Sequence, residues 1–217
     1  MKLSRRSLAV IVGSSFLALA ACQSAPPPVI PAAFTPLGVS APYLSAEVIG
    51  GSRSRAAKMR AAKIRPLSPA MAPSYMADLD GELRRQTAGI GLDILQVGNG
   101  IVIRIPAALT FDAGSAGVKP QFDATLLEVA RTVKTRNQTF VDVLAHTDTT
   151  GTPAVNEALS QKRAAAVATY LAGHGVAKAR IASKGYGESA PLYVPDDTEP
   201  KRAGNRRVEI RLVPYLG

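Results

Sequence analysis

The sequence is short of several residue types on which many protein functions depend. Its 217 residues include one cysteine, two histidines and no tryptophan. A single cysteine excludes a disulfide within the chain, and the lack of tryptophan leaves the core to aliphatic side chains and a few Tyr and Phe residues. The chain has only 16 acidic residues and 26 basic ones, which gives a formal net charge of +10. Such a basic surface favours an anionic partner: nucleic acid, anionic lipid or a wall polymer.

The one cysteine, Cys22, follows an export leader. Residues 1–21 combine a basic start, an apolar run too short for a comfortable transmembrane helix, and small residues before Cys22. We interpret 1–21 as a signal peptide, and the resemblance of Leu19–Cys22 to a bacterial lipobox predicts lipidation of Cys22. The alternative is an ordinary secretory leader with a chance cysteine. An exported chain would not ordinarily meet genomic DNA and contains no evident nucleic-acid module, so we expect no nucleic-acid partner.

Residues 22–72 are interpreted as a lipid-anchored linker. Its first part is rich in proline, which favours extended, semi-rigid conformations. Residues 51–65 contain six basic residues and no acidic one, a run typical of a solvated, mobile segment. The alternative is an arm that lies on anionic lipid or wall polymer. We expect that any protein partner would bind through residues 43–72.

Residues 73–214 are predicted to form one α+β domain with its core at about 101–214. Periodicity and turn signals predict helices over 74–88, 120–136 and 153–172, and strands over 92–97, 101–105, 140–145, within 176–183, and over 207–213. Gly98-Asn99-Gly100 is typical of a hairpin turn. Ser74 is predicted to cap the first helix, and residues 186–203 are predicted to form a loop. The order predicts a mixed sheet with helices packed on one face, preceded by an extra helix and hairpin.

The stretch from 145 to 163 carries the candidate site. An apolar strand runs into His146, Thr147 and Asp148, and Pro153 suits the first turn of the following helix. Because ligands commonly bind at the carboxyl ends of strands in α/β sheets, we expect Asp148 to face a ligand.

The helix after Pro153 is expected to pack through Val155, Leu159, Ala166 and Tyr170, which share a face at about 100° per residue. Asn156 and Arg163 fall at the edge of that face. An arginine beside a packing stripe is unfavourable without a partner or a ligand. Asp148 is the nearest candidate partner of Arg163 in the sequence. Asp148 and Arg163 together suit a zwitterion, with Asp148 binding an ammonium and Arg163 binding a carboxylate.

Four separated motifs resemble the OmpA C-terminal-like family. They are Thr110–Asp112, A-H-T-D-T-T-G-T-P-A-V-N-E-A-L-S-Q-K-R at 145–163, Gly185–Glu188 and Gly204–Ile210, with Ala145 in place of the family's Gly. The resemblance implies an OmpA-like βαβαββ domain in the periplasm. It also implies binding of peptidoglycan, without catalysis or cofactor, through the diaminopimelate of the stem peptide. The matching positions are Asp148 and Arg163, supported by Asp112, Thr147, Asn156 and Arg206. By resemblance, Gln23 after Cys22 favours the outer membrane.

Each candidate also has a structural alternative. Asp148 would serve as a turn or cap residue, and Arg163 would be a surface arginine whose stem packs. Asp112 would only hold its loop. Arg206 and Arg207 would make surface ion pairs worth about 0–1 kcal/mol, the interpretation we favour for Arg207 but not for Arg206.

An enzyme would have to use His146, Asp148 and Ser160, or a metal held by His146 and His174. Ser160 lies within a predicted helix and no G-x-S-x-G is present. His174 would lie about 30 Å from His146 at 1.5 Å per residue. We therefore expect neither catalysis nor a metal, and we expect His146 to be hydrogen-bonded at the strand end.

The sequence predicts a lipid-anchored tether between the outer membrane and peptidoglycan. The alternative is an envelope signalling or assembly protein that uses wall binding to regulate another protein. A motor stator would need a transmembrane helix bearing a proton-carrying acid, and no such segment follows the leader.

Overall fold

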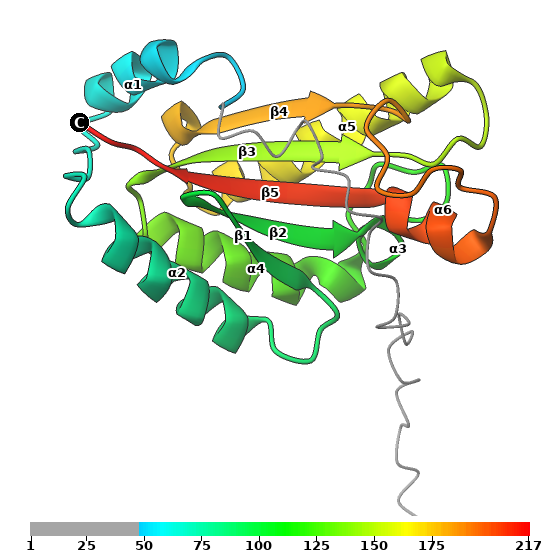
Figure 1. Ribbon diagram of the computed structural model, residues 1–217, viewed down its shortest axis with the longest axis horizontal. Coiled ribbons are helices and arrows are strands. Elements are labelled where there is room, and N and C mark those ends of the chain that lie inside the picture. Colours follow the sequence, from blue (N-terminus) through cyan, green and yellow to red (C-terminus); the bar gives the residue numbers. More distant parts are fainter. Residues whose placement is uncertain (1–47) are drawn as a thin grey trace, which may run out of the picture.

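The computed structural model describes residues 48–217. The predicted leader, Cys22 and the proline-rich part of the linker lie outside these residues. The elements, in chain order, are α1 Ser52–Ala61, α2 Ala72–Gln86, β1 Asp93–Val97, β2 Gly100–Pro106, α3 Ala107–Thr110, α4 Pro120–Thr135, β3 Thr139–His146, α5 Pro153–Gly173, the 3-10 turn η2 Lys178–Arg180, β4 Ile181–Gly185, α6 Glu199–Asn205 and β5 Arg207–Pro214 (Figure 1).

The strands form one mixed sheet in the order β1-β2-β5-β3-β4. β1 and β2 make the predicted hairpin, with Val97 paired to Gly100. β5 lies antiparallel between β2 and β3, and β3 pairs in parallel with β4. The last strand of the sequence therefore lies in the middle of the sheet. This position sets Arg207 opposite His146, so that the last motif begins beside the end of β3.

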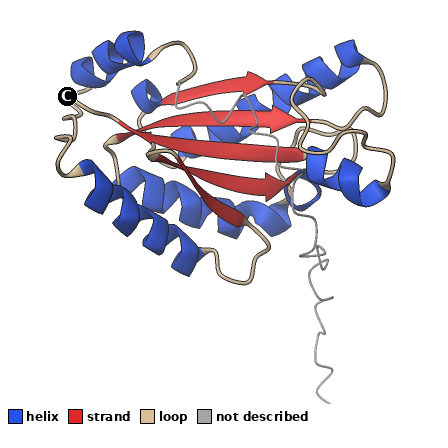
Figure 2. Ribbon diagram, in the orientation of Figure 1, coloured by secondary structure: helices blue, strands red, loops and turns tan. Residues whose placement is uncertain are grey.

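Helices α2, α4 and α5 cover one face of this sheet, as the sequence predicts (Figure 2). The main core contains Leu79 and Leu83 from α2, Leu126 and Val133 from α4, Val167 and Leu171 from α5, and Ile103, Val143 and Ile210 from the strands. The α+β fold class is thereby confirmed. The start of α2 differs from the prediction: Pro73 occupies its first turn, and the Ser74 hydroxyl donates to the carbonyl of Met71 (3.1 Å) instead of capping the helix.

The packing face of α5 also differs from the prediction. Val155 is 60% exposed, whereas the buried residues are Asn156, Ser160, Arg163, Ala164, Val167 and Leu171. Ala164, Val167 and Leu171 continue the core, and the same stripe becomes polar toward the start of the helix. The small apolar residues within that stripe carry little signal, so Val155 and Tyr170 shifted the predicted face. Arg163 lies on the buried face itself, not at its edge.

Strand β5 is buried along its whole length, not half-exposed as predicted. Its charged side chains are buried because they meet opposite charges: Arg207 pairs with Glu209 (2.8 Å), and Arg211 pairs with Asp142 (2.9 Å). The surface interpretation of Arg207 is therefore wrong. The predicted loop over 186–203 also contains the start of a helix, α6.

The basic segment 51–65 is folded, which overturns the expectation of a solvated, mobile run. Residues 52–61 form α1, which packs with Met59 in a second apolar cluster around Phe140, Val213 and Tyr215. Arg55 reaches the first half of β3, where its guanidinium pairs with Asp142 and lies 5.0 Å from the centre of the Phe140 ring. One arginine out of the charge run thus supplies the anchor that fixes the helix.

Candidate functional site

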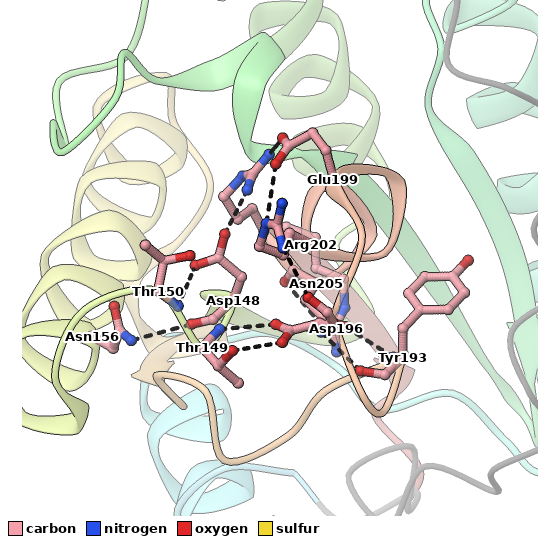
Figure 3. Close-up of polar contacts among 11 residues, drawn as sticks. Asp148, Thr149, Thr150, Asn156, Tyr193, Asp196, Glu199, Arg202 and Asn205 are labelled. Atoms are coloured by element: carbon pink, nitrogen blue, oxygen red, sulfur yellow. Dashed lines mark hydrogen bonds and ion pairs between the residues drawn. The ribbon is translucent and has the colours of Figure 1, made fainter.

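The candidate site lies at the carboxyl end of β3. Thr147 and Asp148 follow the last strand residue, and Thr152 begins α5, accepting a hydrogen bond from the amide of Val155 (3.4 Å). Pro153 occupies the first turn of α5, as expected. The loop after β4 and helix α6 lie beside this end of the sheet (Figure 3). Two stretches of the chain that are distant in sequence, 147–156 and the segment from the loop after β4 to Arg206, therefore meet around one carboxylate.

Asp148 is 5% exposed and is held from two sides. One carboxylate oxygen accepts from the amide of Thr150 (3.0 Å), which is a turn interaction typical of aspartate. The other oxygen forms an ion pair with Arg206. The partner of Asp148 within the chain is thus Arg206 and not Arg163, which was the candidate from sequence proximity. The final motif contributes directly to the site.

Arg163 is 5% exposed and has no carboxylate partner among residues 48–217. Its Nε donates to the carbonyl of Ser115 (2.8 Å), and one terminal nitrogen donates to the carbonyl of Asp112 (3.3 Å). The guanidinium carbon lies 5.1 Å from the centre of the Phe111 ring. A guanidinium has five N–H donors, and two hydrogen bonds use only part of this capacity.

Electrostatics links Arg163 to the other two charges. Burial lowers the pKa of Arg163, and the like charge of Arg206 lowers this pKa further, whereas Asp148 raises it. Glu199 forms ion pairs with both Arg206 and Arg202, and these two arginines hold the pKa of Glu199 below its usual value. The site therefore holds a shared carboxylate, Asp148, beside a buried cation that has no anion of its own within the described chain.

The supporting residues of the prediction fall into two groups. Thr147 and Asn156 are buried at the site: the Thr147 hydroxyl has no hydrogen-bond partner in the described chain, and the Asn156 amide donates to the carbonyl of Asp148 (3.1 Å) and to Glu188 (2.6 Å). The side chain of Asp112 is 80% exposed and lies 3.3 Å from the Lys119 ammonium, so only its backbone carbonyl contacts Arg163.

A second polar network holds the loop beside Asp148, and sequence reasoning did not identify it (Figure 3). Asp196 accepts from the amide of Thr149 (2.9 Å) and from its hydroxyl (2.5 Å). Asn205 accepts from the amides of Leu192 (2.8 Å) and Tyr193 (3.0 Å), and it donates to Asp196 (3.3 Å). Asn205 stands inside the last motif, so the motif itself was the available signal. The contact made by Ser115 had no signal in the sequence.

Gly185 explains why the third motif begins with glycine. A Cβ atom at this position would lie 2.3 Å from the backbone nitrogen of Gln161, so only glycine allows β4 to end against α5. Next to it, the Ser160 hydroxyl donates to the carbonyl of Glu157 (2.9 Å) and accepts from the amide of Gly187 (2.8 Å). Ser160 thus links the helix to the loop after β4.

His146 is fully buried and stacks on Tyr186, with ring centres 5.3 Å apart. Burial, together with the nearby charges of Arg207 and Arg104, lowers the pKa of His146 well below its usual value. His174 lies at the far end of α5, stacked on Tyr170. Among residues 48–217, no group of His, Cys, Asp and Glu has the arrangement of a metal site.

Comparison with known proteins gives a consistent result. Residues 110–206 match the OmpA family. The chain is 39% identical over 140 residues to the probable lipoprotein YiaD of Escherichia coli, and the match covers 64% of each chain. The chain thus spans just under two thirds of that relative.

Solved structures give the same fold. A MotB-like protein from Desulfovibrio vulgaris superimposes with a TM-score of 0.61 at 25% identity, covering 67% of this chain and 94% of that one. The cell wall anchor of the T6SS from Pseudomonas aeruginosa superimposes with a TM-score of 0.55 at 27% identity, covering 61% and 96%.

Proposed function

Residues 110–206 form a domain of the OmpA family, and on this premise we propose a non-catalytic, lipid-anchored protein that binds peptidoglycan. The ligand group is the diaminopimelate of the stem peptide, and the protein tethers the outer membrane to the wall. One observation carries the proposal: Arg163 is a buried guanidinium for which the described chain supplies two carbonyl oxygens and no carboxylate.

A buried cation is costly unless it meets an anion or a full set of acceptors. A carboxylate ligand is suited to Arg163 because a guanidinium can donate to both of its oxygens at once. The Phe111 ring and the carbonyls of Ser115 and Asp112 orient the planar group from the other sides. In this proposal, the free carboxylate of diaminopimelate binds the donors of Arg163 that remain.

The ammonium of the same ligand end is assigned to Asp148. A carboxylate offers about four lone-pair sites, and the amide of Thr150 and Arg206 occupy one each. The remaining sites can accept from an ammonium. Arg206 is held by Glu199 as well, so it can keep a partner when the ligand shares Asp148. The buried Thr147 hydroxyl supplies one further polar group at this place.

The anchor in this proposal is Cys22, because the lipobox-like sequence places the one cysteine at the end of the leader. Along residues 48–217, no helix combines the length and the apolar character that a bilayer crossing requires. Replacing Cys22 with Ser should release the exported protein from the membrane fraction while leaving its binding to sacculi intact. Retention of that variant after a high-salt wash, in cells without wall attachment, would require a second anchor.

The proposal is tested by sedimenting the chain from residue 23 onward with purified sacculi. Free diaminopimelate should compete with binding. Cadaverine is the matched control, because it carries the two ammonium groups of diaminopimelate at the same spacing but has no carboxylate. Failure to sediment with sacculi, or equal competition by cadaverine and diaminopimelate, would contradict the proposal.

A further inference from the structure

Helix α1 and the residues after it carry a second charged surface, far from the site. Five basic side chains are exposed there: Arg53, Lys58, Arg60, Lys63 and Arg65. None of them has an ion pair within the described chain, and no acidic residue occurs between Val48 and Ala77. Lys178, on the turn η2 that packs against α1, is also exposed. We call these six residues the basic end.

The basic end is fixed to the domain. Besides its pairing with Asp142, Arg55 donates to the carbonyls of Val141 (3.3 Å) and Arg180. The amide of Ile49 donates to the same Asp142 (3.0 Å). Arg55 and Met59 are the buried residues of α1, whereas Arg53, Lys58 and Arg60 of the same helix are exposed. Their positions relative to the sheet are set by the fold, unlike those of a charge run in a linker.

The basic end and the candidate site lie at opposite ends of β3. Arg55 contacts the first half of β3, whereas Asp148 follows the end of that strand, about 20 Å away at 3.3 Å per residue. Val48, where the described chain begins, packs in the apolar cluster beside α1. The described chain therefore begins at the basic end.

We propose that the basic end docks on the headgroups of anionic phospholipids in a bilayer. Clusters of four or more cations next to a membrane attachment are attracted to anionic lipid, and each contributes while it lies within a Debye length of the surface. The chain enters the domain at this end, so docking turns Asp148 and Arg163 away from the lipid. The inference concerns the orientation of the domain; it rests on the proposed anchor at Cys22 and does not depend on which ligand the site binds.

The test uses the chain from residue 23 onward, which lacks Cys22 and keeps every described residue. Its binding to vesicles is measured by co-sedimentation, with purely zwitterionic vesicles compared against vesicles that contain 30% anionic phospholipid. We compare a variant with Arg53, Arg60 and Lys63 changed to Gln against a control with Arg85, Lys162 and Lys184 changed to Gln. All six side chains are exposed, so both variants are expected to fold, and circular dichroism checks this.

The parent and the control should bind anionic vesicles and not zwitterionic ones. The Arg53/Arg60/Lys63 variant should bind roughly 100-fold more weakly, since each cation near an anionic surface contributes a factor of about five. The difference should disappear in about 1 M salt, where the Debye length is about 3 Å. Equal binding by the two variants, or equal loss in both, would overturn the proposal. So would loss of sacculus binding with unchanged vesicle binding, which would assign the basic end to the wall polymer.

Discussion

Two buried arginines near opposite ends of β3 differ in how far the protein satisfies them. Arg180 is fully buried and donates four hydrogen bonds: to the carbonyls of Thr139 (2.8 Å), Val133 (2.5 Å) and Arg136 (3.0 Å), and to the Thr139 hydroxyl (2.8 Å). Arg163 is 5% exposed and makes two. Burial lowers the pKa of both groups, that of Arg180 to about 10, so Arg180 stays charged at neutral pH.

Under the proposed function, this difference separates a structural charge, Arg180, from a ligand-binding charge, Arg163. Backbone carbonyls from α4, β3 and their connection accept hydrogen bonds from the Arg180 guanidinium. The ion pair between Arg55 and Asp142 lies beside it. Around Arg163, the chain orients the group but leaves donors for a ligand. Burial is therefore common to both arginines, and the unused hydrogen-bonding capacity of Arg163 is the observation that supports the proposed ligand site.

The largest effect is expected at Asp142. This fully buried carboxylate pairs with Arg55 and Arg211, so Asp142→Ala leaves two buried cations without their acid. Breaking a buried ion pair from one side costs about 3–5 kcal/mol. Urea denaturation should show a loss of this size in the free energy of unfolding. A loss below about 1 kcal/mol would mean that the network is not structural.

Arg180 and Arg163 can be compared directly by changing each to Met. Arg180→Met leaves four acceptors without their donor, and each unsatisfied buried group costs about 1–3 kcal/mol, so we expect a loss of about 3 kcal/mol or more. Arg163→Met leaves only two acceptors and also removes a buried cation that has no anion in the described chain, so it should cost less than Arg180→Met and should abolish sacculus binding. Urea denaturation measures the loss of stability in each variant. Equal losses would contradict the distinction between a structural Arg180 and a ligand-binding Arg163.

Asp148→Ala should mainly affect binding. Hydrogen bonds to charged groups contribute roughly 1.5–3 kcal/mol, so sacculus binding should weaken about tenfold or more. Arg206 keeps Glu199 as a partner, which limits the loss of stability. Sedimentation with sacculi and circular dichroism on the same preparation measure the two effects. An unfolded variant would show instead that Asp148 is a structural residue.

A smaller effect is expected from His146, whose pKa is lowered by burial and by Arg207 and Arg104. Below about pH 6.5, the unfolded chain takes up a proton on this residue that the folded chain does not bind. The free energy of unfolding should therefore fall as the pH decreases, by up to about 1.4 kcal/mol per pH unit from this group. His146→Asn should show a shallower slope between pH 7 and pH 5, and identical slopes would exclude the effect.

Much of the fold could be predicted because its signals are local. Gly98-Asn99-Gly100 identified the hairpin, and the apolar period of α4 identified a helix whose boundaries agree within a residue or two. The burial of β5 could not be predicted in the same way. Alternating charge is typical of an exposed face, and only the central position between β2 and β3 buries Arg207, Glu209 and Arg211.

Most of the residues that gather at the candidate site could be named from the sequence, but the pairing of their charges could not. Asp148 and Arg163 stand 15 residues apart on neighbouring elements, so sequence proximity favoured a direct pair. The pairing with Arg206 depends on β5 lying beside β3, a contact between residues 58 positions apart. Arg55 could not be distinguished from the other cations of its run, because its carboxylate partner is 87 residues away.

The central claim is that Arg163 is held ready for a ligand carboxylate, and Arg163→Lys tests it most directly. Lysine keeps the positive charge but cannot donate to both oxygens of a carboxylate as the planar guanidinium does. Binding of free diaminopimelate to the parent and to Arg163→Lys should be measured by isothermal titration calorimetry, with unfolding followed in parallel. We predict a folded variant that binds diaminopimelate at least about tenfold more weakly. A folded variant with the affinity of the parent would contradict the account.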